Sequence, residues 1–164
     1  MYFSKEADIR QNHSWTMRKV AKICFCTYLI ALVYYLLFAQ REYLAKGYNL
    51  VPFVEITRYV RYRASMGVRV VVENLGGNII GFVPFGFLLP LMGAIFQKGL
   101  RVCLLIFIFS FCVEGMQLIL QAGCFDVDDI LLNTTGGIVG FILYLAVVYI
   151  RSKINASKKE ETSR

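Results

Sequence analysis

The stretch Asn78–Pro90 reads NIIGFVPFGFLLP, and it decides how the rest of the chain is interpreted. It is apolar enough to cross a bilayer, yet it begins with an asparagine and contains two prolines and two glycines. Proline and glycine are tolerated inside a spanning helix only where neighbouring helices satisfy the freed backbone groups. We therefore expect a kinked or broken span that packs against other spans.

Apolar residues elsewhere in the chain are also gathered into long blocks. The chain has 164 residues, enough for one domain, and 57% of them are hydrophobic. Four blocks reach or approach the length of about 17–25 residues that a membrane helix needs. We predict an all-α fold, an integral membrane four-helix bundle with helices at about 23–39, 78–96, 102–120 and 130–150.

The four blocks also set the domain boundaries. The transmembrane domain is expected at 23–150, between basic tails at 1–22 and 151–164. The first block lies too far inside the chain for an ordinary signal peptide, so we expect it to be retained as a helix. An exterior interfacial segment, 40–77, joins the first two helices.

Lysine and arginine predict the orientation of the bundle. Twelve of them lie in the two tails and in the loop 97–101, whereas six lie in 40–77 and none in 121–129. Since cytoplasmic loops carry the excess of basic residues, both termini are expected in the cytoplasm of a multi-pass protein of the bacterial cytoplasmic membrane. The net charge of +7 then reflects topology and attraction to anionic lipid, and nothing indicates nucleic acid as a partner.

The exterior segment alternates apolar and basic residues. Arg58, Arg61, Arg63 and Arg69 are interleaved with aliphatic and tyrosine side chains, as in a segment that lies among lipid headgroups. One interpretation is simple interfacial anchoring. The other is a basic platform for an anionic envelope polymer or a lipid-linked precursor.

Unusual polar residues converge near the predicted outer surface. At 1.5 Å per residue, Pro84 and Glu114 each lie roughly 9 Å inside the outer ends of their helices. The remaining polar residues of this region fall at similar depth or just outside. The sequence predicts an outward-facing polar pocket that contains Asn78, Pro84, Glu114, Gln117, Asp126, Asp128, Asp129 and Asn133.

Glu114 is the most unusual of these residues, because an ionisable group at that depth is costly and usually faces the bundle interior or water. One hypothesis is a structural clamp. Pro84 leaves the carbonyl of Ile80 without its helical partner, and a protonated Glu114 would donate a hydrogen bond to that carbonyl or to Asn78. The other hypothesis, which the sequence leaves open, is a functional proton or ligand site.

The acidic stretch DVDDILLN, residues 126–133, also has two interpretations. Aspartates before an apolar run cap a helix and suit its dipole. Two or three carboxylates would equally suit a divalent cation or the amine of a substrate. We predict no resident metal and no cofactor. The five cysteines form no disulfide framework, and the lone histidine, His13, lies in the N-terminal tail.

Two small-residue patterns predict close helix packing. Gly136-x-x-x-Gly140 and Gly77-x-x-x-Gly81 have the spacing that lets two helix backbones approach. We expect them to bring the second and fourth helices close to the third, which carries Glu114.

Four sequence blocks together resemble the VanZ-like family: NLVPF at 49–53, NIIGFVPFGFLL at 78–89, EGMQ at 114–117 and FDVDDILLNTTGGIVGF at 125–141. The resemblance covers roughly residues 49–142. It implies prominent positions at Asn78, Phe82, Pro84, Gly86, Glu114, Gln117, Asp126, Asp129, Asn133 and Gly137. It also implies an association with resistance to the glycopeptide teicoplanin, without the peptidoglycan remodelling used against vancomycin and without an established molecular mechanism.

We therefore expect a membrane protein that lowers teicoplanin susceptibility through its outer pocket. The expected partner is a membrane lipid or a lipid-linked cell-wall precursor, with the glycopeptide affected indirectly. The alternative is an enzyme that modifies an envelope lipid with Glu114 as general acid/base. No serine or cysteine nucleophile beside a base is evident, which favours the non-enzymatic role. Transport, with Glu114 as a proton relay, is the least favoured. The oligomeric state stays open.

Overall fold

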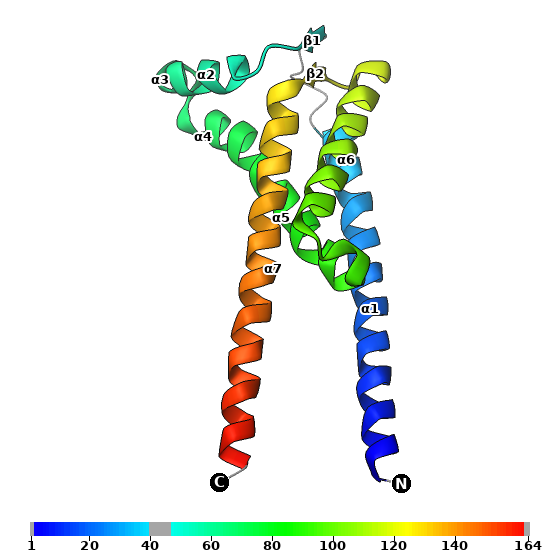
Figure 1. The fold of residues 1–164 in the computed structure, drawn as a ribbon. Helices are drawn as coiled ribbons and strands as arrows, with labels where there is room; N and C mark the ends of the chain where they lie inside the picture. Colours follow the sequence, from blue (N-terminus) through cyan, green and yellow to red (C-terminus); the bar gives the residue numbers. More distant parts are fainter. Residues whose placement is uncertain (1, 40–46, 163–164) are drawn as a thin grey trace.

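The computed structural model describes residues 2–39 and 47–162, which form an α-helical bundle. Within these residues, four helices are long and apolar enough to cross a membrane: Trp15–Phe38, Val68–Met92, Gly99–Ile119 and Val127–Lys158. Figure 1 shows both termini at one end of the bundle, as four spans require. The predicted all-α four-helix membrane fold is confirmed.

The first, third and fourth spans lie on single long helices. The first belongs to α1 (Tyr2–Tyr34), which continues into a π-helical segment, η1 (Tyr35–Ala39). The third is α6 (Gly99–Ile119), and the fourth belongs to α7 (Val127–Thr162). Thus α1 and α7 extend through most of the polar tails predicted at 1–22 and 151–164, where lysine, glutamate and alanine are good helix formers.

The second span is assembled from short helical pieces. It runs through α4 (Val68–Val71), the π-helical η2 (Val72–Gly76), α5 (Gly77–Leu88) and the 3₁₀ turn η3 (Leu89–Met92). It begins ten residues before the predicted start at 78, in what we had assigned to the exterior segment. Arg69 and Glu73 form an i,i+4 ion pair of 2.6 Å, which lets two charges stand on a helix that enters the bilayer.

The two prolines act differently. Pro84 lies inside α5, whereas Pro90 lies at the start of η3, where α5 ends. Proline has no N–H to donate and its ring clashes with the preceding turn, so the predicted helix 78–96 stops being α-helical at Leu88. The 3₁₀ turn η4 (Ala94–Phe96) then leads into α6.

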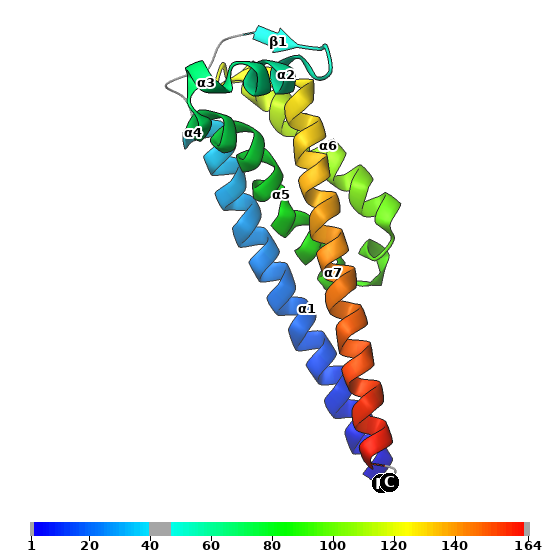
Figure 2. The ribbon, with the colours of Figure 1, turned by 90° about the vertical axis from the view of Figure 1, so that its left-hand side faces the viewer.

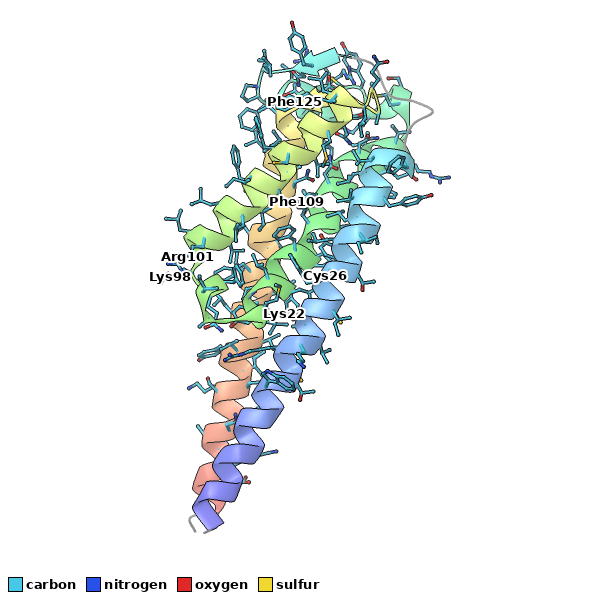
Figure 3. The ribbon with its side chains drawn as sticks, turned by 90° about the vertical axis from the view of Figure 1, so that its right-hand side faces the viewer. Lys22, Cys26, Lys98, Arg101, Phe109 and Phe125 are labelled. Carbon is cyan, nitrogen blue, oxygen red and sulfur yellow. The ribbon has the colours of Figure 1, made fainter. Side chains whose placement is uncertain are left out.

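Aromatic residues of α1, α5 and α6 form the centre of the core. Phe82 is fully buried, and the rings of Phe25 and Phe85 meet edge to face with centroids 5.1 Å apart. Phe109 of α6 lies 5.2 Å from Phe85 and is labelled within the bundle in Figure 3. Such pairs add about 0.5–1.5 kcal/mol each beyond the burial of their area.

Glycines let α5 and α7 pack backbone to backbone along the seam visible in Figure 2. A Cβ at Gly136 would overlap the carbonyl of Ile79, and one at Gly140 the carbonyl of Val83. Gly86 makes the corresponding close contact from the side of α5, because a Cβ at this position would overlap the backbone of Gly137. The first predicted pattern therefore joins the second and fourth helices directly. The second is wrong: Gly77 faces open space and Gly81 only the side chain of Leu32.

Short elements cover the end of the bundle opposite the termini, which we call the far end. There β1 (Gly47–Asn49) pairs in parallel with β2 (Cys124–Asp126), two strands that the sequence did not predict. The helices α2 (Val54–Arg61) and α3 (Arg63–Met66) lie across this end in Figures 1 and 2. Figure 3 places Phe125 there, whereas Lys22, Lys98 and Arg101 lie toward the termini.

Candidate functional site

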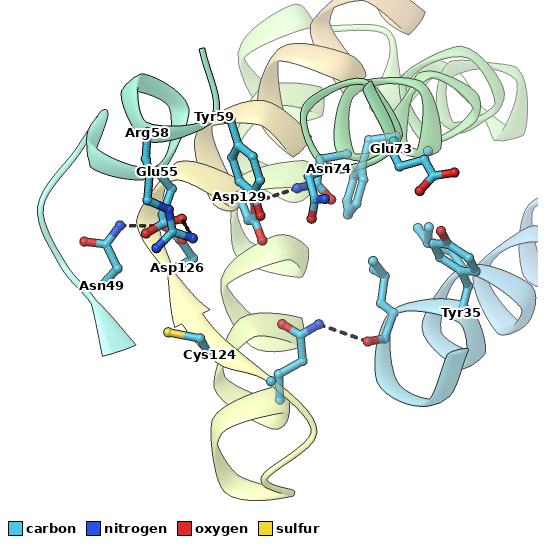
Figure 4. A pocket seen from close by; sticks show the side chains of 18 residues that line it. Tyr35, Asn49, Glu55, Arg58, Tyr59, Glu73, Asn74, Cys124, Asp126 and Asp129 are labelled. Atoms are coloured by element: carbon cyan, nitrogen blue, oxygen red, sulfur yellow. Dashed lines mark hydrogen bonds and ion pairs between the residues drawn. The ribbon is translucent and has the colours of Figure 1, made fainter. Parts of the chain in front are cut away.

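A cavity of about 210 Å³ opens at the far end, between helices from all four spans and the α2 cover. Figure 4 shows its wall from close by. Phe82, Leu32 and Leu36 form its apolar floor. Its polar and aromatic side chains come from eight different elements: Tyr35, Asn49, Glu55, Arg58, Tyr59, Glu73, Asn74, Asn78, Gln117, Asp126 and Asp129.

Four of the eight predicted pocket residues line this cavity, namely Asn78, Gln117, Asp126 and Asp129. The other four, Pro84, Glu114, Asp128 and Asn133, do not belong to its wall. Each of the buried polar ones has a separate hydrogen bond that holds the wall in place or joins helices deeper in the bundle.

Asp126 lies where β2 passes into α7. Its Oδ1 accepts the backbone N–H of Asp128 at 2.8 Å, which caps the start of α7. The same oxygen accepts Nδ2 of Asn49 at 3.1 Å, which secures β1. Burial raises the pKa of the Asp126 carboxyl above its ordinary value, against these hydrogen bonds, which lower it.

Asp128 caps a helix far away in the sequence. Its carboxylate is fully buried and accepts three backbone N–H groups at the start of α2: Phe53 at 2.5 Å, Glu55 at 2.8 Å and Ile56 at 3.2 Å. The helix has no side-chain cap of its own, since the residue before it, Phe53, has no polar side-chain atom; Phe53 adopts the left-handed conformation with φ 67°. The capping interpretation of the acidic stretch thus applies to two helices.

Asp129 joins α7 to α5, because its Oδ1 accepts Nδ2 of Asn78 at 2.5 Å. Gln117 joins α6 to the end of the first span: its Nε2 donates to the carbonyl of Leu36 at 3.0 Å. Leu36 lies in the π-helical segment η1, whose carbonyls are displaced from regular α-helical bonding. These two bonds join the four spans in two pairs around the cavity: the second to the fourth, and the first to the third.

Glu114 has a partner different from the two we expected. It is 2% exposed, and its Oε2 accepts the backbone N–H of Asp126 at 3.1 Å. Near Pro84, it is the hydroxyl of Tyr28 that reaches α5, where it donates to the carbonyl of Gly81 at 2.6 Å. The structure thus gives Glu114 a clamping contact with the end of β2, directly before α7, in place of one with α5.

Asn133 lies deeper between α6 and α7, and its Nδ2 donates to the hydroxyl of Ser110 at 2.9 Å. Its Oδ1 is buried without a hydrogen-bond partner among the described residues. Within that same part of the chain, no group of three or more His, Cys, Asp or Glu side chains is arranged to hold a metal ion.

The four arginines of the exterior segment have different surroundings. Arg58 lines the cavity and pairs with Glu55 at 2.5 Å. Arg69 pairs with Glu73, and Arg63 donates to the carbonyl of Val60 at 2.9 Å. Neither of these two nor Arg61 lines the cavity.

Several wall residues escaped the sequence reasoning, above all Glu55, Tyr59, Glu73 and Asn74. Their sequence signal was weak, because all four lie in 40–77, which the sequence analysis assigns to an exterior segment among lipid headgroups. Burial raises the pKa of Glu55 while Arg58 lowers it. Burial also raises the pKa of the Cys124 thiol, another wall residue, which keeps it protonated and a poor nucleophile.

Comparison with known proteins matches this architecture to one family. The sequence model of the VanZ/LLP1 family matches residues 25–149, most of the chain. The protein VanZ of Enterococcus faecium is 29% identical over 126 residues, which cover 71% of this chain and 68% of that protein. No solved structure matches the chain. The match covers the second and third spans, most of the first and fourth, and the acidic stretch 126–133, and it shows that this chain belongs to the VanZ/LLP1 family.

Proposed function

We propose that this protein lowers susceptibility to the glycopeptide teicoplanin by engaging an envelope lipid or a lipid-linked cell-wall precursor through the far-end cavity. The observation that carries the proposal is the polar cavity itself. It gathers carboxylates and amides from the second, third and fourth spans and from the short elements of the far end, where a headgroup in the interface would reach them. We propose teicoplanin as the antibiotic because the VanZ family is associated with resistance to it.

The proposed orientation places this cavity outside and both termini in the cytoplasm of a bacterium. Both termini lie at the end opposite the cavity, whereas Lys98, just before α6, and Arg101, in its first turn, lie about midway along the molecule on the side away from the cavity. The basic residues of the two tails and of the loop 97–101 outnumber those of the exterior segment by twelve to six. A C-terminal fluorescent-protein fusion should glow and a C-terminal alkaline phosphatase fusion should be inactive; the opposite pair of results would reverse the orientation.

The functional test is antibiotic susceptibility in a sensitive Gram-positive host. We would compare empty vector, the wild-type protein, Asp129→Asn at the cavity wall and Glu161→Gln near the C-terminus, at matched expression. The wild type and Glu161→Gln should raise the inhibitory concentration of teicoplanin but not of vancomycin, and Asp129→Asn should not. A well-expressed wild type that changes neither concentration would overturn the proposal.

The enzymatic alternative has less support. Glu114, the candidate general acid/base, lies outside the cavity wall, and its Oε2 is engaged by the backbone of Asp126. A general acid/base must reach the reacting atoms directly or through one water. A new lipid species in expressing membranes that disappears in Glu114→Gln would restore this alternative.

A further inference from the structure

The charges on the cavity wall are unbalanced. Glu55, Glu73, Asp126 and Asp129 contribute four carboxylates, whereas Arg58 is the only cation among the described lining residues. Arg58 is already paired with Glu55. Glu73 is paired with Arg69 outside the wall. Asp126 and Asp129 therefore form no ion pair within the described part of the chain.

The free polar atoms of the wall are mostly hydrogen-bond acceptors. Asp126 and Gln117 are each only 8% exposed. Asp126 accepts both of its side-chain hydrogen bonds on Oδ1, so Oδ2 has no donor among the described residues. Asp129 likewise uses only Oδ1, and Gln117 uses only its Nε2. These free oxygens belong to residues that line the cavity and are not closed off from solvent, so a ligand that brings N–H groups and positive charge can form charge-assisted hydrogen bonds with them.

The dimensions of the cavity limit what can enter. At about 210 Å³ it is smaller than the 300–1,000 Å³ that suits a whole drug-sized ligand, so it admits one polar end of a larger molecule. No described side chains are arranged to hold a bare metal ion. Arg58 is 49% exposed on its side chain and has N–H groups beyond those that contact Glu55, which suits a phosphate next to the entering group.

We infer that the far-end cavity binds the primary ammonium end of an amphiphilic envelope molecule, with Asp126, Asp129 and Gln117 as acceptors. The inference rests on the proposed function and specifies the chemical class of its ligand. A primary ammonium supplies three N–H donors and one positive charge, which match the acceptors that the wall leaves free. A trimethylated ammonium has the same charge but no N–H donor.

The test uses the full-length protein in phosphatidylglycerol nanodiscs that contain equal amounts of phosphatidylethanolamine and phosphatidylcholine. Native mass spectrometry of the released protein measures which lipid stays bound. The wild type should retain phosphatidylethanolamine over phosphatidylcholine. Asp129→Asn should lower this preference by about tenfold, because a charge-assisted hydrogen bond becomes a neutral one. Its amide oxygen still accepts from Asn78, so the variant should fold.

Two further variants make the result decisive. Glu55→Gln leaves Arg58 unpaired beside the cavity and should also reduce the preference, which keeps the test valid if Asp129→Asn fails to fold. Glu161→Gln removes a carboxylate at the other end of the bundle and should retain the wild-type preference. Equal retention of the two lipids by the wild type would overturn the inference, and so would an unchanged preference in both folded wall variants.

Free ethanolamine identifies the source of the ammonium group. Displacement of the bound lipid by ethanolamine supports the headgroup as ligand, and binding of ethanolamine without any lipid preference supports a soluble amine instead. The antibiotic test is independent of both. Teicoplanin protection without a preference for N–H donors overturns only the ammonium inference, and a clear preference without protection overturns only the proposed function.

Discussion

Replacing Asp128 by Asn should release the start of α2 from the bundle. The carboxylate accepts three backbone N–H groups, from Phe53, Glu55 and Ile56. Hydrogen bonds to a charged group contribute about 1.5–3 kcal/mol each, and we use the lower value because water can reach exposed Phe53. Three such bonds amount to about 4–5 kcal/mol, and a neutral amide with one acceptor oxygen would keep roughly half. The expected loss is about 2 kcal/mol.

Hydrogen–deuterium exchange measures this loss where it arises. A loss of about 2 kcal/mol in local opening free energy makes the amides at the start of α2 exchange about 30 times faster. Asp129→Asn is the matched control, with the same chemical change one residue away, and it should leave α2 protected. Unchanged exchange in Asp128→Asn, or equal acceleration in both variants, would refute the assignment of Asp128 as the cap of α2.

Three further predictions concern packing, the buried glutamate and pH. Gly140→Ala should destabilise the bundle by more than about 2 kcal/mol, because the new Cβ would overlap the carbonyl of Val83. Gly77→Ala is the control, since its Cβ meets open space. Equal melting temperatures of the two variants would contradict the glycine seam. Glu114→Gln still accepts the N–H of Asp126 and should stay stable, whereas Glu114→Leu should lose about 1–3 kcal/mol in chemical denaturation; similar losses would exclude the clamp. Folding raises the pKa of the Asp126 carboxyl above its ordinary value of 3.8. The contribution of this carboxyl to folding stability is therefore fully present below pH 3.8 and is lost as the pH rises through the raised pKa of the folded state. The stability of the wild type relative to Asp126→Asn should therefore fall as the pH rises across this window, and a constant or rising difference would contradict it.

The fold could be predicted because the membrane imposes length and composition on each span. The prediction was wrong where charged residues lie within a membrane-spanning helix. Arg69 and Glu73 look like part of an exterior loop, but as an i,i+4 pair they stand on the second span. The seam between α5 and α7 was only half predicted, since Gly136 and Gly140 were recognised and Gly86 was not assigned to it. A spacing of four residues shows that a small face exists but does not show which helix it meets.

The candidate site could be predicted only as far as depth along a helix determines neighbours. Asn78, Gln117 and Asp129 lie on spans at similar depth, and they do line one cavity. Glu55 and Tyr59 could not be placed, because α2 reaches the cavity through contacts with Asp128 that join residues more than 70 positions apart. No local pattern encodes such a contact. The parallel pairing of β1 with β2 is equally non-local.

Asp128 and Asp129 are adjacent in the acidic stretch 126–133, but they have different roles in the cavity. Asp128 positions α2 and thereby builds one wall of the cavity, whereas Asp129 belongs to the wall and keeps one oxygen free of donors from the described residues. Neutralising either one should weaken ammonium binding, but for different reasons. Asp128→Asn should weaken ammonium binding and also speed hydrogen exchange in α2. Asp129→Asn should weaken ammonium binding and leave exchange in α2 unchanged. A pair of variants one residue apart can thus separate assembly of the cavity from contact with the ligand, which no single substitution at this turn can do.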